Sequence, residues 1–110
     1  MTDERIEKIK SAVEAADHIP AEKKAELLAI LANLKPAIAK VAETHPEDAQ
    51  NIGQVVEASV QIAARENKRP ERLENAVREL KQSVEKFEAS HPELAAFVNR
   101  YSTLLSALGI

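Results

Sequence analysis

The sequence predicts an all-α protein: a single domain, residues 1–110, folded as an up-and-down bundle of about five helices. First, 19 of the 110 residues are alanine, and the polar residues are mostly Glu, Lys, Arg and Gln, which lose little side-chain freedom in a helix. Second, apolar residues recur three and four positions apart, which collects them on one helix face. Third, the chain has only two glycines and no alternation of β-branched residues, so nothing favours strands.

The first helix is expected over residues 3–17. Thr2 is in position to act as its N-cap, and the acidic residues that follow are favoured in a first helical turn. The segment before Pro20 ends this helix, because proline suits the first turn of the next one. The apolar residues of the first helix fall on one face: Ile6, Ile9, Val13 and Ala16.

The second helix is expected over residues 20–43, with Leu28 and Ile30 widening its apolar face. Pro36 removes one backbone hydrogen bond and crowds the preceding turn, so we expect a kink near residues 33–35. We expect no chain break, because the apolar spacing continues in register past the proline. The main face carries five residues: Leu27, Leu31, Leu34, Ile38 and Val41.

The third, fourth and fifth helices are expected over residues 46–66, 70–88 and 92–108. The segments Thr44-His-Pro-Glu and Ser90-His-Pro-Glu precede the third and the fifth. Each resembles a capping box, in which the hydroxyl accepts a backbone N–H bond and the glutamate bonds back. The apolar face of the fourth helix carries Leu73, Val77, Leu80, Val84 and Phe87, and that of the fifth carries Leu94, Phe97, Val98, Tyr101, Leu104, Leu105 and Leu108.

Gly109 and Ile110 predict how the fifth helix ends. Glycine readily takes the left-handed conformation that terminates a helix, and an apolar residue after it folds back onto the last turns. We therefore expect a left-handed Gly109, with Ile110 packed against Leu104 or Leu105.

Residues 34–62 align with residues 80–108 without gaps, and both segments contain His-Pro-Glu. One interpretation is a duplicated helical hairpin preceded by an N-terminal helix. The other is convergence, since any two capped amphipathic helices align in this way. A closed bundle fits both, because two units are too few to cover their own apolar faces in a solenoid.

The distribution of charge predicts which helices lie inside. Residues 49–64 contain a single charged residue, Glu57, and residues 94–108 contain only Arg100. Such wide apolar bands are rarely exposed on a monomer, so we expect the third and fifth helices to be central, with the other three around them. The alternative is that one of these bands forms a homo-oligomer interface, and the expected interaction residues are Ile52, Val55, Val56 and Val60.

The inventory of reactive side chains predicts no enzyme and no cofactor. The chain has no cysteine, no glycine-rich phosphate loop and no His-Glu-x-x-His segment. His45 and His91 are expected at one end of the bundle, opposite His18, and are the nearest approach to a metal site. We expect no metal, because the two histidines have no third ligand beside them. A small-molecule pocket lined by aromatic rings is a further hypothesis, although these rings also suit the core: Phe87, Phe97 and Tyr101.

A basic cluster lies at the turn spanning residues 65–72: Arg65, Lys68, Arg69 and Arg72. A nucleic-acid-associated accessory protein that contacts phosphates through this turn is the alternative functional hypothesis. Glu66 and Glu71 interrupt the cluster, and the chain carries a net charge of −3. We therefore prefer a solvated turn and expect no nucleic-acid partner.

The C-terminal third carries a recognisable pattern in Phe87–Leu94, Asn99-Arg100 and Leu105–Ile110, and Ala21–Leu28 adds to it upstream. It resembles a family of short, functionally uncharacterised bacterial helical proteins that share a C-terminal Ser-His-Pro segment. The resemblance covers about half of the chain, and residues 44–70 look like extra length relative to that family. It implies a helical fold and a bacterial origin and adds no chemistry.

The sequence therefore predicts a small, non-enzymatic helical-bundle protein that acts through contacts with a protein partner or as a homo-oligomer. No small-molecule substrate is identified. The charged start of the chain has no apolar stretch behind it, and no apolar run is long enough to cross a membrane. We expect no membrane association and a cytoplasmic location.

Overall fold

The structure is a computed structural model that describes residues 3–65 and 70–109. Within these residues it contains five helices and no strand, which confirms the predicted all-α bundle. The helix ends lie close to the predicted ones, and the largest difference is at the end of the fourth helix, which stops at Glu85 and not at residue 88. The helices are α1 (Asp3–Ala15), α2 (Ala21–Thr44), α3 (Pro46–Ala64), α4 (Pro70–Glu85) and α5 (Pro92–Gly109).

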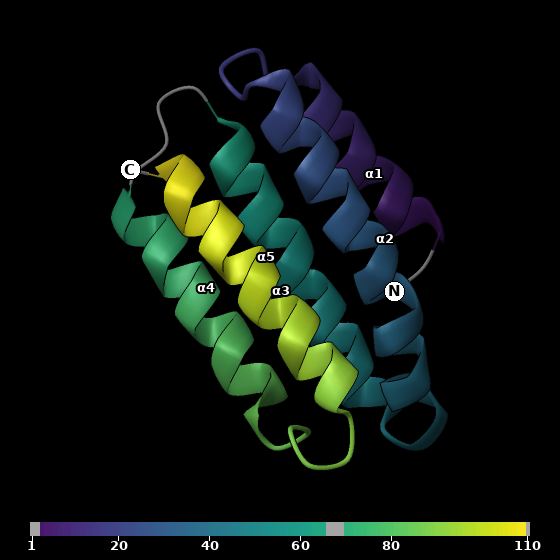
Figure 1. The fold of residues 1–110 in the computed structure, drawn as a ribbon. Helices are drawn as coiled ribbons and strands as arrows, with labels where there is room; N and C mark the ends of the chain where they lie inside the picture. Colours follow the sequence, from purple (N-terminus) through teal and green to yellow (C-terminus); the bar gives the residue numbers. More distant parts are fainter. Residues whose placement is uncertain (1–2, 66–69, 110) are drawn as a thin grey trace.

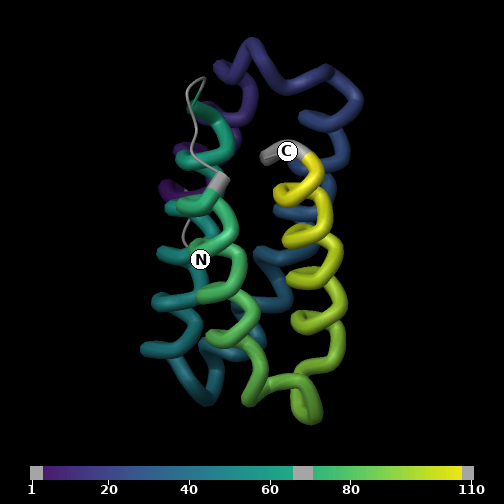
Figure 2. Tube along the Cα trace, turned by 90° about the vertical axis from the view of Figure 1, so that its left-hand side faces the viewer, coloured from purple at the N-terminus to yellow at the C-terminus, as the bar shows by residue number. Residues whose placement is uncertain are grey.

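Helices α2, α3, α4 and α5 form an antiparallel four-helix bundle, in which each packs against the next and α5 returns to α2 (Figure 1). The remaining helix, α1, lies on the outside of this bundle against α2 and α3. The α2–α3 and α4–α5 turns lie at one end, and the α1–α2 turn lies at the other (Figures 1 and 2). His45 and His91 therefore share one end of the bundle and His18 lies at the opposite end, as predicted.

The central helix is α3, because it packs against all four others. In contrast, α5 packs against α2, α3 and α4 but not against α1 within the described residues, so the prediction that the first, second and fourth helices all surround it is wrong. Residues 94–108 contain few charges because the exposed face of α5 consists mostly of small, neutral side chains, and not because the whole helix is buried. This face carries Ala96, Asn99, Arg100, Thr103, Ser106 and Ala107.

One continuous hydrophobic core joins the five helices. Each helix contributes at least one side chain that is almost completely buried: Ile9, Leu27, Ile52, Leu80 and Tyr101. Burying an apolar side chain of this size contributes about 1.5–3 kcal/mol. The apolar faces predicted for the first, second and fourth helices all point into this core.

Pro36 lies inside α2, which continues unbroken from Ala21 to Thr44. The predicted continuity of the second helix is therefore confirmed. Pro36 is exposed, whereas Leu34 and Ile38 are buried, so the apolar face stays in register through the proline. The bend expected at this point stays a prediction.

The predicted serine and threonine caps are wrong. Thr44 is the last residue of α2, and His45 occupies the N-cap position of α3 without a side-chain cap bond. The Thr44 hydroxyl instead lies 2.8 Å from Nδ1 of His45. Likewise, α5 begins at Pro92, one residue too late for Ser90 to cap it. In both places proline opens the helix, and because it has no N–H, it leaves one donor fewer for a cap to satisfy.

The predicted left-handed end of the fifth helix is also wrong. Gly109 is still helical, and no glycine among the described residues has a positive φ angle. The helix can extend to this position because glycine accepts helical dihedral angles as well as left-handed ones. Thr2 and Ile110, the other residues of the predicted helix ends, lie outside the described residues.

Candidate functional site

An open groove of about 700 Å³ runs between the exposed sides of α2 and α5. This volume is in the range of known ligand sites. Neither helix alone forms the groove, because its walls come from segments far apart in the sequence. The walls are Lys23, Glu26, Ala29, Ile30 and Asn33 on α2, and Asn99, Arg100, Thr103, Leu104 and Ala107 on α5.

A contact outside the groove gives the approximate register of its two walls. Lys40 of α2 and Glu93 of α5 form an ion pair with an N–O distance of 3.9 Å. Since the two helices are antiparallel and each rises about 1.5 Å per residue, equal steps away from this pair lead to residues that lie level with each other. Seven steps lead to Asn33 and Arg100, and ten steps lead to Ile30 and Thr103. Fourteen steps lead to Glu26 and Ala107.

Small side chains keep this groove open. Ala29 on one wall and Ala107 on the other both end at Cβ, so space is left above the larger side chains between the helices. Leu104 is buried and Ile30 is half-buried, and together they provide an apolar floor. An apolar side chain that entered the groove from outside would therefore lose contact with water and gain a favourable free energy.

The charges of the groove lie toward its ends. Lys23 and Glu26 form an ion pair at 3.5 Å within the first turns of α2, and their side chains are 41% and 56% exposed. Arg100, on the opposite wall and toward the opposite end, is exposed. It makes no ion pair with any residue in the described part of the chain. An arginine in this position can bind a carboxylate supplied from outside.

Other exposed surfaces of the bundle have a different character. The outer face of α4 is densely charged and carries Glu71, Arg72, Glu74, Arg78, Glu79, Lys81 and Glu85. Between residues 50 and 61, the exposed positions of α3 have no formal charge but carry hydrophilic amides: Gln50, Asn51, Gln54 and Gln61, with Ala58 among them. The α2–α5 groove thus differs from both faces in having an apolar floor.

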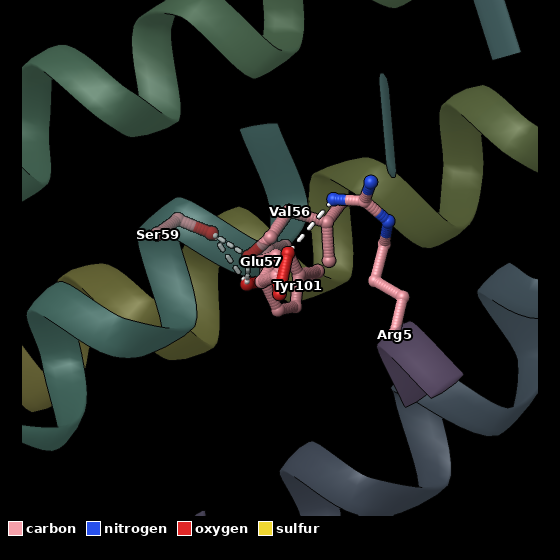
Figure 3. A network of polar contacts seen from close by, with 5 residues as sticks. All are labelled: Arg5, Val56, Glu57, Ser59 and Tyr101. Carbon is pink, nitrogen blue, oxygen red and sulfur yellow. Dashed lines mark hydrogen bonds and ion pairs between the residues drawn. The ribbon is translucent and has the colours of Figure 1, made fainter. Parts of the chain in front are cut away.

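A buried polar network joins α3 to α5 (Figure 3). The hydroxyl of the fully buried Tyr101 lies 2.6 Å from Oγ of Ser59 and 3.1 Å from the carbonyl oxygen of Val56. Ser59 Oγ lies 2.7 Å from the same carbonyl oxygen. Each hydroxyl carries one proton, so one hydroxyl donates to the carbonyl and the other donates to its neighbouring hydroxyl. Both buried hydroxyls are therefore satisfied.

Burial raises the pKa of Tyr101 well above its ordinary value, and the hydrogen bond with Ser59 lowers it by a smaller amount. The phenol therefore stays neutral in the folded protein. A group of this kind, enclosed in the core and already hydrogen-bonded, is suited to holding two helices in register. It is not placed to exchange protons with a substrate.

The isolated Glu57 of the third helix has a structural partner. Nη1 of Arg5 in α1 lies 2.8 Å from Oε2 of Glu57, and the side chains are 20% and 18% exposed (Figure 3). This partly buried ion pair ties α1 to α3. The sequence alone did not reveal Arg5 or Ser59 as network residues, although a single charge within an apolar helix is a signal that a partner exists.

The expected interaction residues of the third helix lie inside the bundle. Ile52, Val55, Val56 and Val60 are 0–7% exposed and belong to the core of a single chain. Other helices of the same chain cover them because α3 is central. The structure therefore offers no surface made of these side chains, and a contact surface has to be sought elsewhere.

The imidazole rings of His45 and His91 both contact the ring of Phe87 at one end of the bundle. Their ring centroids are 5.3 and 5.8 Å from the centroid of Phe87, in edge-to-face geometry. Lys86 lies 5.4 Å from the same ring and pairs with Asp48 at 2.8 Å. Within the described residues, no group of three or more His, Asp or Glu side chains is placed to hold a metal.

At the opposite end, His18 binds the end of α3. Its Nε2 lies 2.9 Å from the carbonyl oxygen of Ala63. A carbonyl can only accept, so Nε2 carries the proton and donates it. This contact fixes the α1–α2 turn on the bundle.

The remaining candidates do not converge. Among the aromatic residues, Phe87 and Tyr101 are buried and Phe97 is half-buried, and none of the three lines the α2–α5 groove. In the basic turn, Arg65 and Arg72 are exposed. The other two members of that cluster, Lys68 and Arg69, lie outside the described residues.

The groove was missed at the sequence level, although one signal pointed toward it. Ile30 extends the apolar face of the second helix past the residues that are buried in the core, and it forms part of the groove floor. The other wall gives no such signal, because Leu104 belongs to the apolar face already expected for the fifth helix and the remaining wall residues are small or polar.

None of the described helices is both long enough and apolar enough to cross a membrane.

The chain was compared with known proteins. A family profile described as a domain of unknown function (DUF4404) matches residues 39–110. The match contains α3, α4 and α5, and with them the α5 wall of the groove, whereas the α2 wall precedes it. It also includes residues 44–70 and begins after residues 21–28. No curated protein and no solved structure matched the chain.

Proposed function

We propose that this chain, which belongs to the DUF4404 family of domains of unknown function, is a non-enzymatic helical module that binds protein through the α2–α5 groove. The observation that carries the proposal is the apolar floor of this groove, formed by Ile30 and Leu104 and left open by alanines on both walls. Grooves of this kind between two helices accept the apolar face of a third helix.

The chain already binds one helix in a similar way. The apolar face of α1 packs against α2 and α3, and the Arg5–Glu57 ion pair adds a polar contact beside it. The α2–α5 groove offers the same two components, an apolar floor and a charged residue, Arg100, at its edge. A partner helix with a complementary carboxylate is therefore a suitable occupant.

The groove favours binding over catalysis. General acid–base or nucleophilic catalysis needs reactive side chains within hydrogen-bond reach of one another and of a substrate. The polar residues of the walls are separated along the groove, and Glu26 is already paired with Lys23. The three histidines lie at the ends of the bundle and line neither wall.

Site-specific photo-crosslinking in the cells that naturally express the protein tests the proposal. A photoreactive phenylalanine at Ala29 or Ala107 is expected to form covalent adducts with protein. The matched control is the same amino acid at Ala58, which is exposed on α3 outside the groove and is expected to form none. Folded protein that gives no adduct at either groove position would contradict the proposal.

A further inference from the structure

Three side chains that can donate hydrogen bonds lie at one end of the α2–α5 groove. Asn33 and Arg100 are about level with each other on opposite walls, and Asn99 precedes Arg100 in α5. All three are exposed, and none of them forms a side-chain hydrogen bond or an ion pair within residues 3–65 and 70–109. A guanidinium only donates and an amide can donate, so this end of the groove suits a ligand that accepts hydrogen bonds.

The charge of the groove favours an anion at the same end. Its walls carry two cations, Lys23 and Arg100, and one carboxylate, Glu26. Lys23 and Glu26 pair with each other toward the other end, so the charge that remains uncompensated is that of Arg100. A guanidinium binds a carboxylate through two parallel hydrogen bonds, which makes a carboxylate the best match for this position.

The apolar floor of the groove lies about one helical turn from these donors. Leu104 follows Arg100 by four residues in α5, a rise of about 6 Å, and Ile30 precedes Asn33 by three residues in α2. A partner helix that lies along the groove rises by the same amount per residue. Its residue over the floor and its residue beside Arg100 are therefore three or four positions apart, a spacing that puts both on one helix face.

We infer that the partner of the groove is an acidic amphipathic helix, in which an Asp or Glu lies three or four residues from an apolar residue on the same face; this inference rests on the proposed function. The apolar residue packs on the floor, in the space that Ala29 leaves open. The carboxylate binds Arg100, with Asn33 and Asn99 as further donors. A basic helix is disfavoured, because it would place a second cation beside Arg100.

Selection from a library of displayed helical peptides tests the inference. Each peptide carries two leucines four residues apart on one face and random residues elsewhere, and the target is the purified full-length chain. Binders are expected to be enriched in Asp and Glu three or four residues from a leucine. The double variant A29E/A107E places carboxylates on both walls of the groove and is expected to lose these binders. Circular dichroism verifies that each variant is folded.

Substitutions that change little in shape test the donors directly. Asn33→Asp puts a carboxylate beside Arg100, where it repels the acidic residue of a selected peptide, and is expected to weaken binding several-fold at physiological salt. Arg100→Lys keeps the charge but not the planar fork, and is expected to cost less affinity than Arg100→Gln. The matched control Asn51→Asp makes the same change on α3 outside the groove and is expected to leave the affinity unchanged.

Four outcomes would overturn the inference. These are binders without enrichment of acidic residues, equal weakening by N33D and N51D, the absence of any binder that A29E/A107E loses, and a purified chain that dimerises through the groove. The last outcome would identify a second copy as the occupant.

Failure of the proposed function is a separate result, because it requires that Ala29 and Ala107 form no adduct with protein in cells. Groove adducts that N33D leaves unchanged in cells would refute only the acidic partner and would keep the groove as a protein-binding site.

Discussion

Among single residues, the two buried serines differ in whether their hydroxyl groups are hydrogen-bonded. Ser59 is satisfied by Tyr101 and by a backbone carbonyl. Ser102 is also buried, but its hydroxyl has no hydrogen-bond partner in the described part of the chain. Leaving a buried hydroxyl unpaired costs about 1–3 kcal/mol, whereas removing it leaves only an apolar methyl group. Ser102 is therefore a destabilising feature of this core.

We predict that Ser102→Ala raises the free energy of unfolding by about 1 kcal/mol, because it removes the unpaired hydroxyl. Urea unfolding followed by circular dichroism measures this change. Ser106→Ala, at an exposed position of the same helix, controls for the higher helix propensity of alanine and is expected to have a smaller effect. Equal gains in the two variants would show that the buried hydroxyl has found a partner.

Tyr101 gives the stability a dependence on alkaline pH. Because burial raises the pKa of Tyr101 in the folded state, the unfolded chain loses this proton first, above about pH 10. The unfolded state then binds fewer protons, so the free energy of unfolding falls as pH rises, by about 1.4 kcal/mol per pH unit for this one group. The stabilisation by neutral Tyr101 is fully present below about pH 10.

Tyr101→Phe is predicted to remove this pH-dependent component. The variant should be less stable than the unchanged protein at neutral pH, because the hydrogen bonds of the phenol are lost. The stability difference should shrink between pH 10 and pH 11, since only the unchanged protein loses its tyrosine contribution. Lysines titrate in both proteins and cancel in the comparison. A difference that stays constant up to pH 11 would mean that Tyr101 ionises without unfolding.

These residue-level contacts were only partly predictable. The isolated charge of Glu57 is a signal that it has a partner, but nothing in the sequence selects Arg5, because the two residues belong to different helices. Their distance depends on how α1 crosses α3, which is a property of the packed bundle. The same holds for Tyr101 and Ser59, since each one alone reads as an ordinary core or helix residue.

At the scale of the element, helix existence and the buried faces follow from the sequence, because apolar spacing and helix geometry have the same period. The position of α5 in the bundle could not be predicted from the sequence, because a helix with few charges can be either buried or exposed with small neutral side chains. Asn99, Thr103 and Ala107 are uncharged residues of α5 that are exposed. The groove could not be predicted either, since its two walls meet only through the packing of α2 on α5.

Pro36 destabilises α2 locally. A proline inside a helix removes one backbone bond and clashes with the preceding turn, and it is about 3 kcal/mol less favourable than alanine. Part of this cost is offset because proline also restricts the unfolded chain. We predict that Pro36→Ala raises the free energy of unfolding by about 1–2 kcal/mol, measured by urea denaturation. A less stable variant would mean that the neighbouring helices require a bend at this position.

At the scale of the whole molecule, α3 determines cooperativity. It packs against every other helix, and its residues lie in the same core as those of α1, α2, α4 and α5. Separating α3 from any of the other four helices therefore exposes part of this shared core. Such an arrangement favours a single unfolding transition for all five helices.

Ile52→Ala, a cavity at the centre of α3, tests this view. Ile52 is completely buried, and truncation of such a side chain costs about 2–5 kcal/mol. Ile62→Ala is the matched control, because the same residue type in the same helix is only half-buried and should cost less. The unfolding of the Ile52 variant is followed by circular dichroism, which reports all helices, and by the fluorescence of Tyr101, which reports α5. We predict that the two signals shift together, whereas separate transitions would show that some of the helices unfold independently of α5.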